Sequence, residues 1–373
     1  MLAGGGSRIC VQRYLRQINS FWRCLASVSS KTDVESLECA KPLYLNGRYV
    51  SPWRAWQVPS FSSLTKVLQE KDHSSIPSPQ ELDRTLPVLK PNPASLADPP
   101  ATGIQATWLG HASLLIQMNG INILTDPVFG DTTFPIPSLS PNSFKRYRPV
   151  AMTIEDLPHI DAVLISHNHY DHLDSWSVAR LNRRFGRSLR WLTPMGLKKW
   201  FHRCGCNNVR EFIWWEEELS PLGDGTTFTF VPSQHWCKRG IDDTNKVLWG
   251  GWVVRKGDSS FYFVGDTAYC EVFSQIGHLY GPFTLAAIPI GAYEPRWFMK
   301  MSHINPEEAV QIHKMIRSEN SVGIHWGTFK LTTEFYLEPR TKLKEELERN
   351  TIPLQEFITM SHGETRHFTS NDS

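Results

Sequence analysis

The amino-acid sequence predicts an α/β fold over residues 106–373, and two observations support this prediction. Short apolar, β-branched runs alternate along this region with stretches of helical periodicity. Several of the apolar runs end in a histidine or an aspartate, which is where α/β proteins usually place their chemistry. The alternation shows no internal repeat, and 373 residues suit either one large domain with an extension or two domains.

The clearest strand–helix pair surrounds a cluster of ligand-type side chains. Residues 162–166 predict a buried strand, and Asp174 predicts the N-cap of a helix that runs to Phe185 and stops at Gly186. The loop between them carries four potential metal ligands, His167, His169, Asp171 and His172. Imidazole and carboxylate suit zinc and its first-row neighbours, iron and manganese included. Four ligands at this spacing cannot all close on one ion, so the loop predicts a second metal or distant ligands.

Three later apolar runs supply candidates for those distant ligands. The predicted strand over 228–232 leads into His235, the one over 261–264 leads into Asp266, and the one over 322–324 leads into His325. Asp126 also follows an apolar run, and we expect it to orient a histidine or the metal loop, with a turn aspartate before Pro127 as the alternative.

The ordered set resembles the pattern of the metallo-β-lactamase superfamily: His-x-His-x-Asp-His, a lone His, an Asp after a strand and a final His. Longer stretches resemble one family within it, the N-acyl-phosphatidylethanolamine-hydrolysing phospholipases D. These stretches are 107–112, 124–127, 161–174, 232–239, 287–299 and 324–328. The resemblance runs from about Lys41 onward and does not cover residues 1–40.

The resemblance implies a four-layer αβ/βα metallo-β-lactamase sandwich with an N-terminal extension and two Zn²⁺ ions at one edge. His167, His169 and His235 would hold one ion, Asp171, His172 and His325 the other, and Asp266 would bridge both. A bridging position would remain for water, whose pKa two cations bring towards neutrality. The implied reaction is hydrolysis of N-acyl-phosphatidylethanolamine to N-acylethanolamine and phosphatidic acid, and the family also implies a homodimer.

Three further roles belong to this reading of the site. Asp171 and Asp266 are candidates to carry the proton as well as to bind metal. Tyr170 is a candidate hydrogen-bond donor to a phosphate oxygen, with packing over the loop as the alternative. His303 is a candidate catalytic and substrate-binding residue at the mouth of the site, before a helix that Asn305 caps and Pro306 begins. The family pattern has Gln before this histidine, and Ser302 here predicts changed selectivity with metal binding intact.

Composition divides the chain into three parts. Residues 1–32 contain five basic residues and no acidic one, so residues 1–40 predict a basic amphipathic leader, either a mitochondrial presequence or a membrane-surface anchor. A disordered N-terminus is the third alternative. Residues 41–105 predict a Pro-rich extension without regular structure over 75–100. Residues 106–373 form the predicted hydrolase domain.

Charge and hydropathy bound the partners. The 39 basic and 37 acidic residues nearly balance, so nothing indicates a nucleic-acid surface. No apolar stretch approaches the roughly 20 residues of a membrane span. The family resemblance implies a phospholipid substrate, so without a membrane span we expect an intracellular, peripheral membrane protein. An odd count of seven cysteines fits a reducing compartment. Residues 214–215, 297–298 and 61–68 are the expected lipid-facing stretches.

Two other functions remain open on the sequence. One is a hydrolase of the same fold that acts on a soluble ester, thioester or phosphodiester, because the core ligands are shared by all these chemistries. The other is a non-enzymatic lipid-binding protein, although such a protein has no need of seven ligands.

Overall fold

The computed structural model describes residues 39–53, 66, 75–141, 144–221 and 223–370, and residues 40–373 form one compact unit. The predicted leader over 1–40 lies outside the described residues except at its last two positions, and so does nearly all of the stretch 61–68. Within the described part of the chain, no helix is long and apolar enough to cross a membrane.

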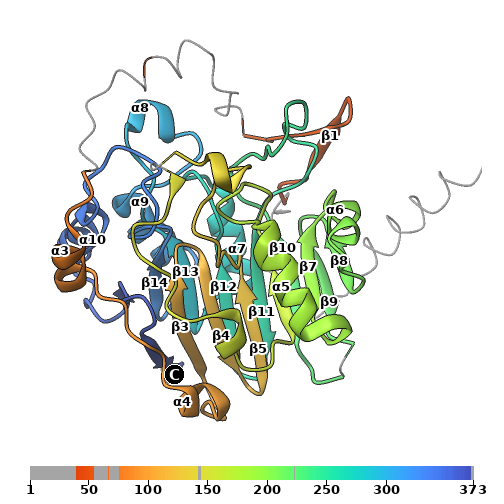
Figure 1. The fold of residues 1–373 in the computed structure, drawn as a ribbon, viewed down its shortest axis with the longest axis horizontal. Helices are drawn as coiled ribbons and strands as arrows, with labels where there is room; N and C mark the ends of the chain where they lie inside the picture. Colours follow the sequence, from red (N-terminus) through yellow and green to blue (C-terminus); the bar gives the residue numbers. More distant parts are fainter. Residues whose placement is uncertain (1–38, 54–65, 67–74, 142–143, 222, 371–373) are drawn as a thin grey trace, which may run out of the picture. The chain divides into compact units, whose positions relative to one another are not determined.

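The first of two seven-stranded sheets contains most of the early strands (Figure 1). Its order is β16-β3-β4-β5-β6-β7-β8, with antiparallel pairing from β16 to β5 and parallel pairing from β5 to β8. The strands are β3 (Ile104–Gly110), β4 (Ser113–Met118), β5 (Ile121–Thr125), β6 (Ala162–Leu164), β7 (Arg190–Pro194), β8 (Val209–Phe212) and β16 (Thr365–Phe368). The first strand of this sheet along the chain, β3, begins at Ile104.

The second sheet repeats this arrangement. Its order is β15-β14-β13-β12-β11-β10-β9, antiparallel from β9 to β12 and parallel from β12 to β15. The strands are β9 (Glu216–Leu219), β10 (Thr227–Val231), β11 (Gly251–Lys256), β12 (Ser259–Phe263), β13 (Leu285–Pro289), β14 (Ser321–Ile324) and β15 (Phe357–Ile358). The structure therefore contains a repeated topology that the sequence does not reveal.

Helices cover the outer faces of the two sheets. α6 packs on β8, while α9 packs on β13 and on its neighbours α7 and α10. The helices after β6 are α5 (Ser175–Phe185), α6 (Lys198–Arg203), α7 (Val272–Tyr280), α8 (Arg296–Met299), α9 (Pro306–Met315) and α10 (Glu338–Arg349). Single 3₁₀ turns occupy Pro137–Leu139, Ile154–Asp156 and Gly186–Ser188. The predicted caps are confirmed: Asp174 accepts from the first turn of α5, and Asn305 forms a capping box with Glu308 in α9.

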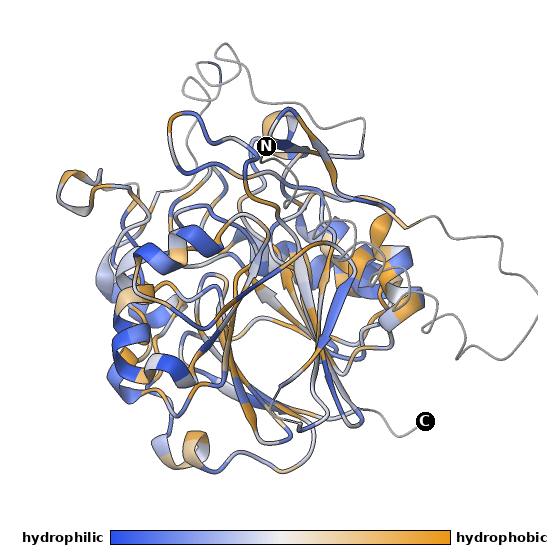
Figure 2. Cartoon of the chain, turned by 90° about the vertical axis from the view of Figure 1, so that its right-hand side faces the viewer, coloured by the Kyte–Doolittle hydropathy of each residue, from blue (hydrophilic) through white to orange (hydrophobic). Residues whose placement is uncertain are grey.

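The inner faces of the sheets share one apolar core, and Figure 2 shows apolar segments along the strands and hydrophilic segments on the outer helices. The Trp252 ring of β11 lies 4.9 Å from the Phe212 ring of β8, and its Nε1 donates to the Ile165 carbonyl after β6. These contacts join the two sheets face to face. Helix, sheet, sheet and helix give the predicted four-layer sandwich.

The Pro-rich segment departs from its prediction. Two short helices form over residues 75–100, α3 (Pro79–Thr85) and α4 (Pro93–Ala97). In each helix the proline stands in the first turn, where its missing N–H has no helical partner to lose, and Ser78 or Asn92 caps the end. The expectation of no regular structure was wrong because these prolines begin helices. A two-stranded ribbon, β1 (Leu43–Leu45) and β2 (Arg48–Val50), precedes them.

One expected lipid-facing residue is also corrected. Trp214 is buried, and its Nε1 donates to the Trp249 carbonyl at 2.6 Å. Trp215 is half-buried and donates to the Ala40 carbonyl, whereas Trp297 on α8 is 44 % exposed as expected. A tryptophan beside acidic residues looks like a surface position, but Trp214 lies in the turn between β8 and β9 and packs against Trp249 and Trp53.

Candidate metal centre

The predicted ligands converge from four loops, each at the carboxyl end of a strand. His167, His169, Asp171 and His172 follow β6 in the first sheet, while His235, Asp266 and His325 follow β10, β12 and β14 in the second. Gly265 makes the approach of the two sheets possible, since a Cβ there would lie 2.9 Å from Cβ of Ser166. Its φ of +68° also favours glycine.

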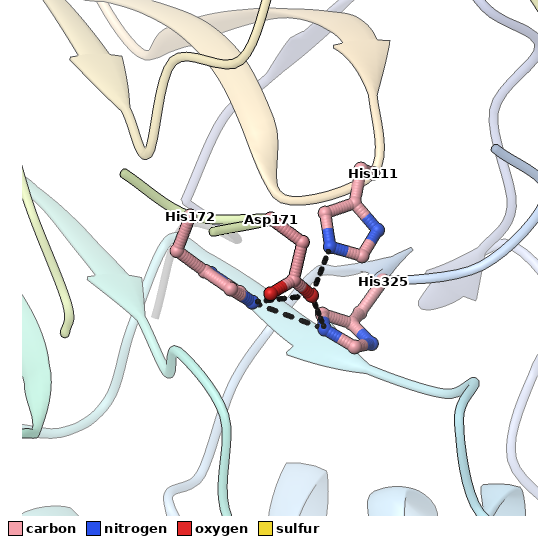
Figure 3. Close-up of side chains that lie close together, drawn as sticks. All are labelled: His111, Asp171, His172 and His325. Carbon is pink, nitrogen blue, oxygen red and sulfur yellow. Dashed lines mark hydrogen bonds and ion pairs between the residues drawn. The ribbon is translucent and has the colours of Figure 1, made fainter. Parts of the chain in front are cut away.

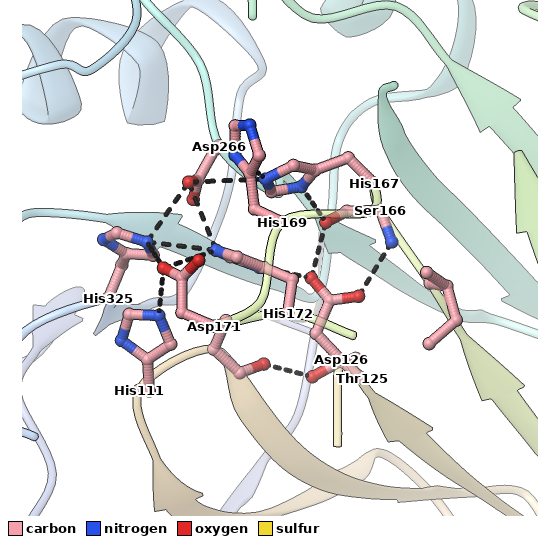
Figure 4. Close-up of polar contacts among 12 residues, drawn as sticks. His111, Thr125, Asp126, Ser166, His167, His169, Asp171, His172, Asp266 and His325 are labelled. Carbon is pink, nitrogen blue, oxygen red and sulfur yellow. Dashed lines mark hydrogen bonds and ion pairs between the residues drawn. The ribbon is translucent and has the colours of Figure 1, made fainter. Parts of the chain in front are cut away.

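Three imidazoles form the three-histidine group, His167, His169 and His235. Figure 4 labels His167 and His169 beside Asp266. Nδ1 of His169 lies 2.8 Å from Nε2 of His167 and 3.3 Å from Nε2 of His235. His167 and His235 are buried, and His169 is half-buried. Three nitrogens that face one another in this way need a shared cation or protons between them.

The aspartate–histidine group, Asp171, His172 and His325, lies beside the first (Figure 3). Oδ2 of Asp171 is 3.4 Å from Nε2 of both His172 and His325, and these two nitrogens are 3.1 Å apart. A fourth side chain completes the group, because Nε2 of His111 lies 3.0 Å from the same Asp171 oxygen.

Asp266 stands between the two groups. Its Oδ2 is 3.2 Å from Nε2 of His172 and of His325 and 3.8 Å from Nε2 of His167 and of His235. Among the described residues, its buried Oδ1 has no hydrogen-bond partner. One carboxylate therefore reaches nitrogens of both groups, as the predicted bridging ligand must.

Hydrogen bonds on the far side of three rings fix which nitrogen faces the centre. Nδ1–H of His172 donates to Oδ2 of Asp126 at 2.7 Å, and Nδ1–H of His235 donates to the Ser302 carbonyl at 2.9 Å. The Ser166 hydroxyl gives its proton to Asp126, so it accepts from Nδ1–H of His167 at 2.9 Å. Each neutral ring then keeps its Nε2 lone pair for a cation.

Asp126 has the orienting role that the sequence predicted, with a backbone contact to Ser166 N at 2.7 Å as well. The contact from Ser302 to His235 uses the main-chain carbonyl. A serine in place of glutamine at this position therefore leaves the orientation of His235 intact.

The electrostatics differ between the two groups. Burial lowers the pKa of His167 and His235 well below the usual value and that of His169 to about 4. Burial also acts on His325, but the carboxylates of Asp266 and Asp171 outweigh it and raise the pKa to about 9. The pKa of His172 is raised for the same reason. Against their own burial, the neighbouring imidazoles lower the pKa of Asp171 and of Asp266.

The donor set fits divalent cations. The carboxylates of Asp171 and Asp266 favour positive charge on the neighbouring imidazoles, and a bound cation would supply that charge in place of a proton. The buried Oδ1 of Asp266 and Nε2 of His169 have no protein partner in the described part of the chain. Imidazole and carboxylate donors in two adjoining groups are the ligands that zinc, iron and manganese accept.

The remaining predicted site residues lie around this centre. Nδ1 of His303 is 4.0 Å from Oδ2 of Asp266, and the His303 ring is 5.2 Å from the ring of His235. Burial lowers the pKa of His303 to about 4, so its imidazole is neutral at pH 7. Tyr170 donates its hydroxyl proton to the Arg239 carbonyl at 2.9 Å, and the Arg239 guanidinium lies 3.9 Å from its ring centre. This is the packing alternative, and the phosphate contact of Tyr170 stays a prediction.

His111 was absent from the predicted site residues. It follows β3, has a φ of +54°, and its backbone N–H and carbonyl are fixed by Thr328, Trp108 and His325. Burial lowers its pKa to about 3, so its neutral ring donates Nε2–H to Asp171. The available signal was the stretch 107–112, which carried part of the family resemblance and contains this histidine.

Comparison with known proteins agrees with this geometry. The family model described as "Beta-lactamase superfamily domain" matches residues 121–326. The chain is 46 % identical over 321 residues to "N-acyl-phosphatidylethanolamine-hydrolyzing phospholipase D 1" of Caenorhabditis elegans, covering 82 % of this chain and 87 % of the relative. It is 32 % identical over 342 residues to "N-acyl-phosphatidylethanolamine-hydrolyzing phospholipase D, mitochondrial" of Saccharomyces cerevisiae, covering 81 % and 72 %.

Among solved structures, the metallo hydrolase Igni18 of Ignicoccus hospitalis superimposes with a TM-score of 0.55 at 21 % identity, covering 72 % of this chain and 100 % of that one. At this identity the likeness shows the fold. The two sheets, the flanking helices and the ligand loops therefore define a metal-dependent hydrolase of the metallo-β-lactamase superfamily. Within that superfamily, the chain belongs to the N-acyl-phosphatidylethanolamine-hydrolysing phospholipase D family.

Proposed function

We propose that this protein is a zinc-dependent phospholipase D that hydrolyses N-acyl-phosphatidylethanolamine to N-acylethanolamine and phosphatidic acid. The single observation that carries the proposal is the convergence of all seven predicted ligands on one buried centre, with Asp266 between the two groups. The relatives that bear this activity in their names support the choice of substrate.

His167, His169 and His235 would hold one Zn²⁺, Asp171, His172 and His325 the second, and Asp266 both. Two such cations lower the pKa of water between them and stabilise negative charge on phosphoryl oxygens. In the net reaction water adds at phosphorus, the bond from phosphorus to the ethanolamide oxygen breaks, and that oxygen takes a proton. Asp171 and Asp266 are the proposed proton carriers, because both carboxylates face the centre.

His303 is the proposed substrate-binding and catalytic group at the mouth. Its ring is neutral at pH 7, and its buried Nδ1 has no partner within the described residues. Arg296 holds the His303 carbonyl at 2.8 Å and pairs with both oxygens of Glu308, which fixes the loop that presents the imidazole. A fixed, uncharged imidazole can donate to a phosphate oxygen without repelling the cations.

The proposed partner is a membrane surface that carries the phospholipid. The leader over 1–40 is proposed either to anchor the protein there or to direct it to mitochondria. The name of the yeast relative includes the word mitochondrial. Deletion of residues 1–30 separates the two roles. Weaker binding to anionic vesicles with intact hydrolysis of a soluble phosphodiester supports the anchor, and unchanged vesicle binding supports the presequence. The homodimer stays a proposal from the family, and sedimentation equilibrium tests it.

The reaction is tested by mass spectrometry of products released from vesicles that contain N-acyl-phosphatidylethanolamine, with His169→Ala beside the native chain. We expect phosphatidic acid and N-acylethanolamine from the native protein alone. No release from native, zinc-loaded protein would overturn the lipid substrate, and activity of that protein on soluble esters would support the other hydrolase function.

A further inference from the structure

The β1–β2 ribbon carries an unusual set of exposed apolar side chains. Leu43, Tyr44 and Leu45 of β1 are 45 %, 57 % and 59 % exposed, and Val50 of β2 is 38 % exposed. Successive side chains of a strand point to opposite faces, so both faces of β1 are open to solvent. Such a cluster on a protein surface indicates an interaction site.

The ribbon is held firmly at its inner side. Asn46 and Gly47 form its turn with φ of +51° and +78°, as a tight hairpin requires. The Tyr49 side chain is buried, and the backbone N–H of Tyr49 donates to the Asn245 carbonyl at 2.7 Å. Arg48 pairs with Asp242 at 2.6 Å and donates to the Thr244 carbonyl at 2.5 Å. The apolar side chains therefore stand on a fixed support.

The supporting loop adds one more apolar side chain. Ile241, directly before Asp242 in this loop, is 98 % exposed. We name Leu43, Tyr44, Leu45, Val50 and Ile241 the apolar platform. Figure 1 shows the β1 ribbon standing off from the sandwich.

The platform is connected to the metal centre through one short loop. Residues 237–245 begin two positions after His235, and their Arg239 donates to the Asn168 and Leu173 carbonyls at 3.2 Å and 2.6 Å. Those carbonyls lie on either side of His169, Asp171 and His172. A ligand bound to the platform would therefore lie beside the mouth of the metal centre.

The charges around the platform indicate which ligand this is. Residues 40–51 contain Lys41 and Arg48 and no acidic residue. Asp242 forms ion pairs with Arg48 and Lys246. Lys41 and Lys238 are exposed and form no ion pair within the described part of the protein. Apolar side chains flanked by lysines suit the boundary between acyl chains and anionic headgroups.

We propose that the apolar platform inserts into the surface of an anionic phospholipid bilayer and seats the metal centre on it. This inference rests on the proposed function for its choice of a lipid, and it assigns the contact to the ribbon and the 237–245 loop. A second copy of the chain fits less well. Five side chains are far fewer than the roughly 20 residues per side of a stable interface, and a two-fold contact would bring the lysines of both copies together.

The test uses the full chain and vesicles of phosphatidylcholine with or without phosphatidylserine, which contain no substrate. With the anionic vesicles, we expect hydrogen–deuterium exchange to slow in peptides that cover 41–51 and 238–246 and to stay unchanged in 216–221. The variant Leu43→Ser/Leu45→Ser should bind the same vesicles about tenfold more weakly, because two half-exposed leucines no longer enter the acyl region. Leu219→Ser, at a leucine that is 60 % exposed on β9, is the matched control.

Unchanged exchange in both peptides, or unchanged vesicle binding by the double variant, would overturn the proposal. Conversion of a native dimer to a monomer by the double variant, with vesicle binding retained, would assign the platform to a second copy instead. Thermal unfolding of both variants should match the native chain, and so should the hydrolysis of substrate in detergent micelles by Leu219→Ser. Micellar hydrolysis tests the proposed function separately. If the native chain did not hydrolyse the substrate in micelles, the binding of the platform to substrate-free vesicles would still be established by its own measurement.

Discussion

The three-histidine group and the aspartate–histidine group lie side by side, yet they respond oppositely to burial. Burial lowers the pKa of all three imidazoles in the first group, where no carboxylate belongs to the group itself. In the second group, Asp171 and Asp266 outweigh burial and raise the pKa of His172 and His325. The first group is thus ready for a cation at neutral pH, whereas the second must release protons to bind one.

This difference teaches how the two groups depend on their supports. The first is held by a serine hydroxyl and a backbone carbonyl, Ser166 and Ser302. The second is held by a carboxylate and an imidazole, Asp126 and His111. Changes to Asp126 and His111 should therefore affect the second group more strongly than the first.

The largest effect is expected from the removal of a ligand in the first group. His169→Ala should lower the rate of lipid hydrolysis about a thousandfold or more, because several kcal/mol of charge stabilisation go with the ion. It should also lower metal content by one ion per chain, as elemental analysis would show. His159→Ala, at an exposed histidine, is the control. Loss of both ions from His169→Ala would break the division into two groups.

A smaller effect is expected from Asp126→Asn. The amide N–H₂ of asparagine would face Nδ1 of His172, where two donors cannot pair. The His172 ring would then keep its lone pair on Nδ1 and carry its proton on Nε2, which faces the centre. We expect metal affinity or activity to fall about 10–100-fold. Titration with a chelator measures the affinity, and Asp98→Asn at the surface should match the native chain. Native affinity in Asp126→Asn would contradict the orienting role.

His111→Asn should have a still smaller and more selective effect. Asparagine tolerates the positive φ of this position but is too short to donate to Asp171. We expect the ion of the aspartate–histidine group to bind about tenfold more weakly, as is usual when a contact that supports a ligand is lost. Binding of the ion of the three-histidine group should be unchanged. Equal weakening of both ions would show that His111 does not distinguish the groups.

The smallest effect concerns His313 in α9, a buried histidine outside the centre. Burial lowers its pKa from 6.5 to about 4. Above pH 6.5 the ring is neutral in both states; between pH 6.5 and 4 the unfolded chain binds more protons, so stability falls as pH falls. His313→Gln should reduce this loss by about 1 kcal/mol per pH unit. Denaturant unfolding at pH 4–7 measures the free energy of unfolding of both proteins. If it fell equally with pH in both, burial would not be what sets the pKa of His313.

Much of the site was predictable because ligand chemistry is local. Apolar runs that end in histidine or aspartate placed each ligand at a strand end, and parallel strands bring such ends to one edge of a sheet. The family resemblance then supplied the order and the division between ions. The cap residues Asp174 and Asn305 were predictable for the same local reason.

The rest depends on contacts that the sequence does not display. His111 reaches Asp171 across 60 positions, and only the pairing of β3 with its neighbours brings them together. The repeated sheet topology has no repeated sequence, because many apolar sequences suit one strand order. Trp214 is buried because Trp249 and Trp53, far away in the sequence, pack against it.

The most direct test of the two-ion centre is a crystal structure of the zinc-loaded protein with anomalous data at the zinc edge. We predict two peaks, one among His167, His169 and His235 and the other among Asp171, His172 and His325, with Asp266 touching both. A single peak, or a second peak away from the aspartate–histidine group, would contradict the division on which the proposed reaction depends.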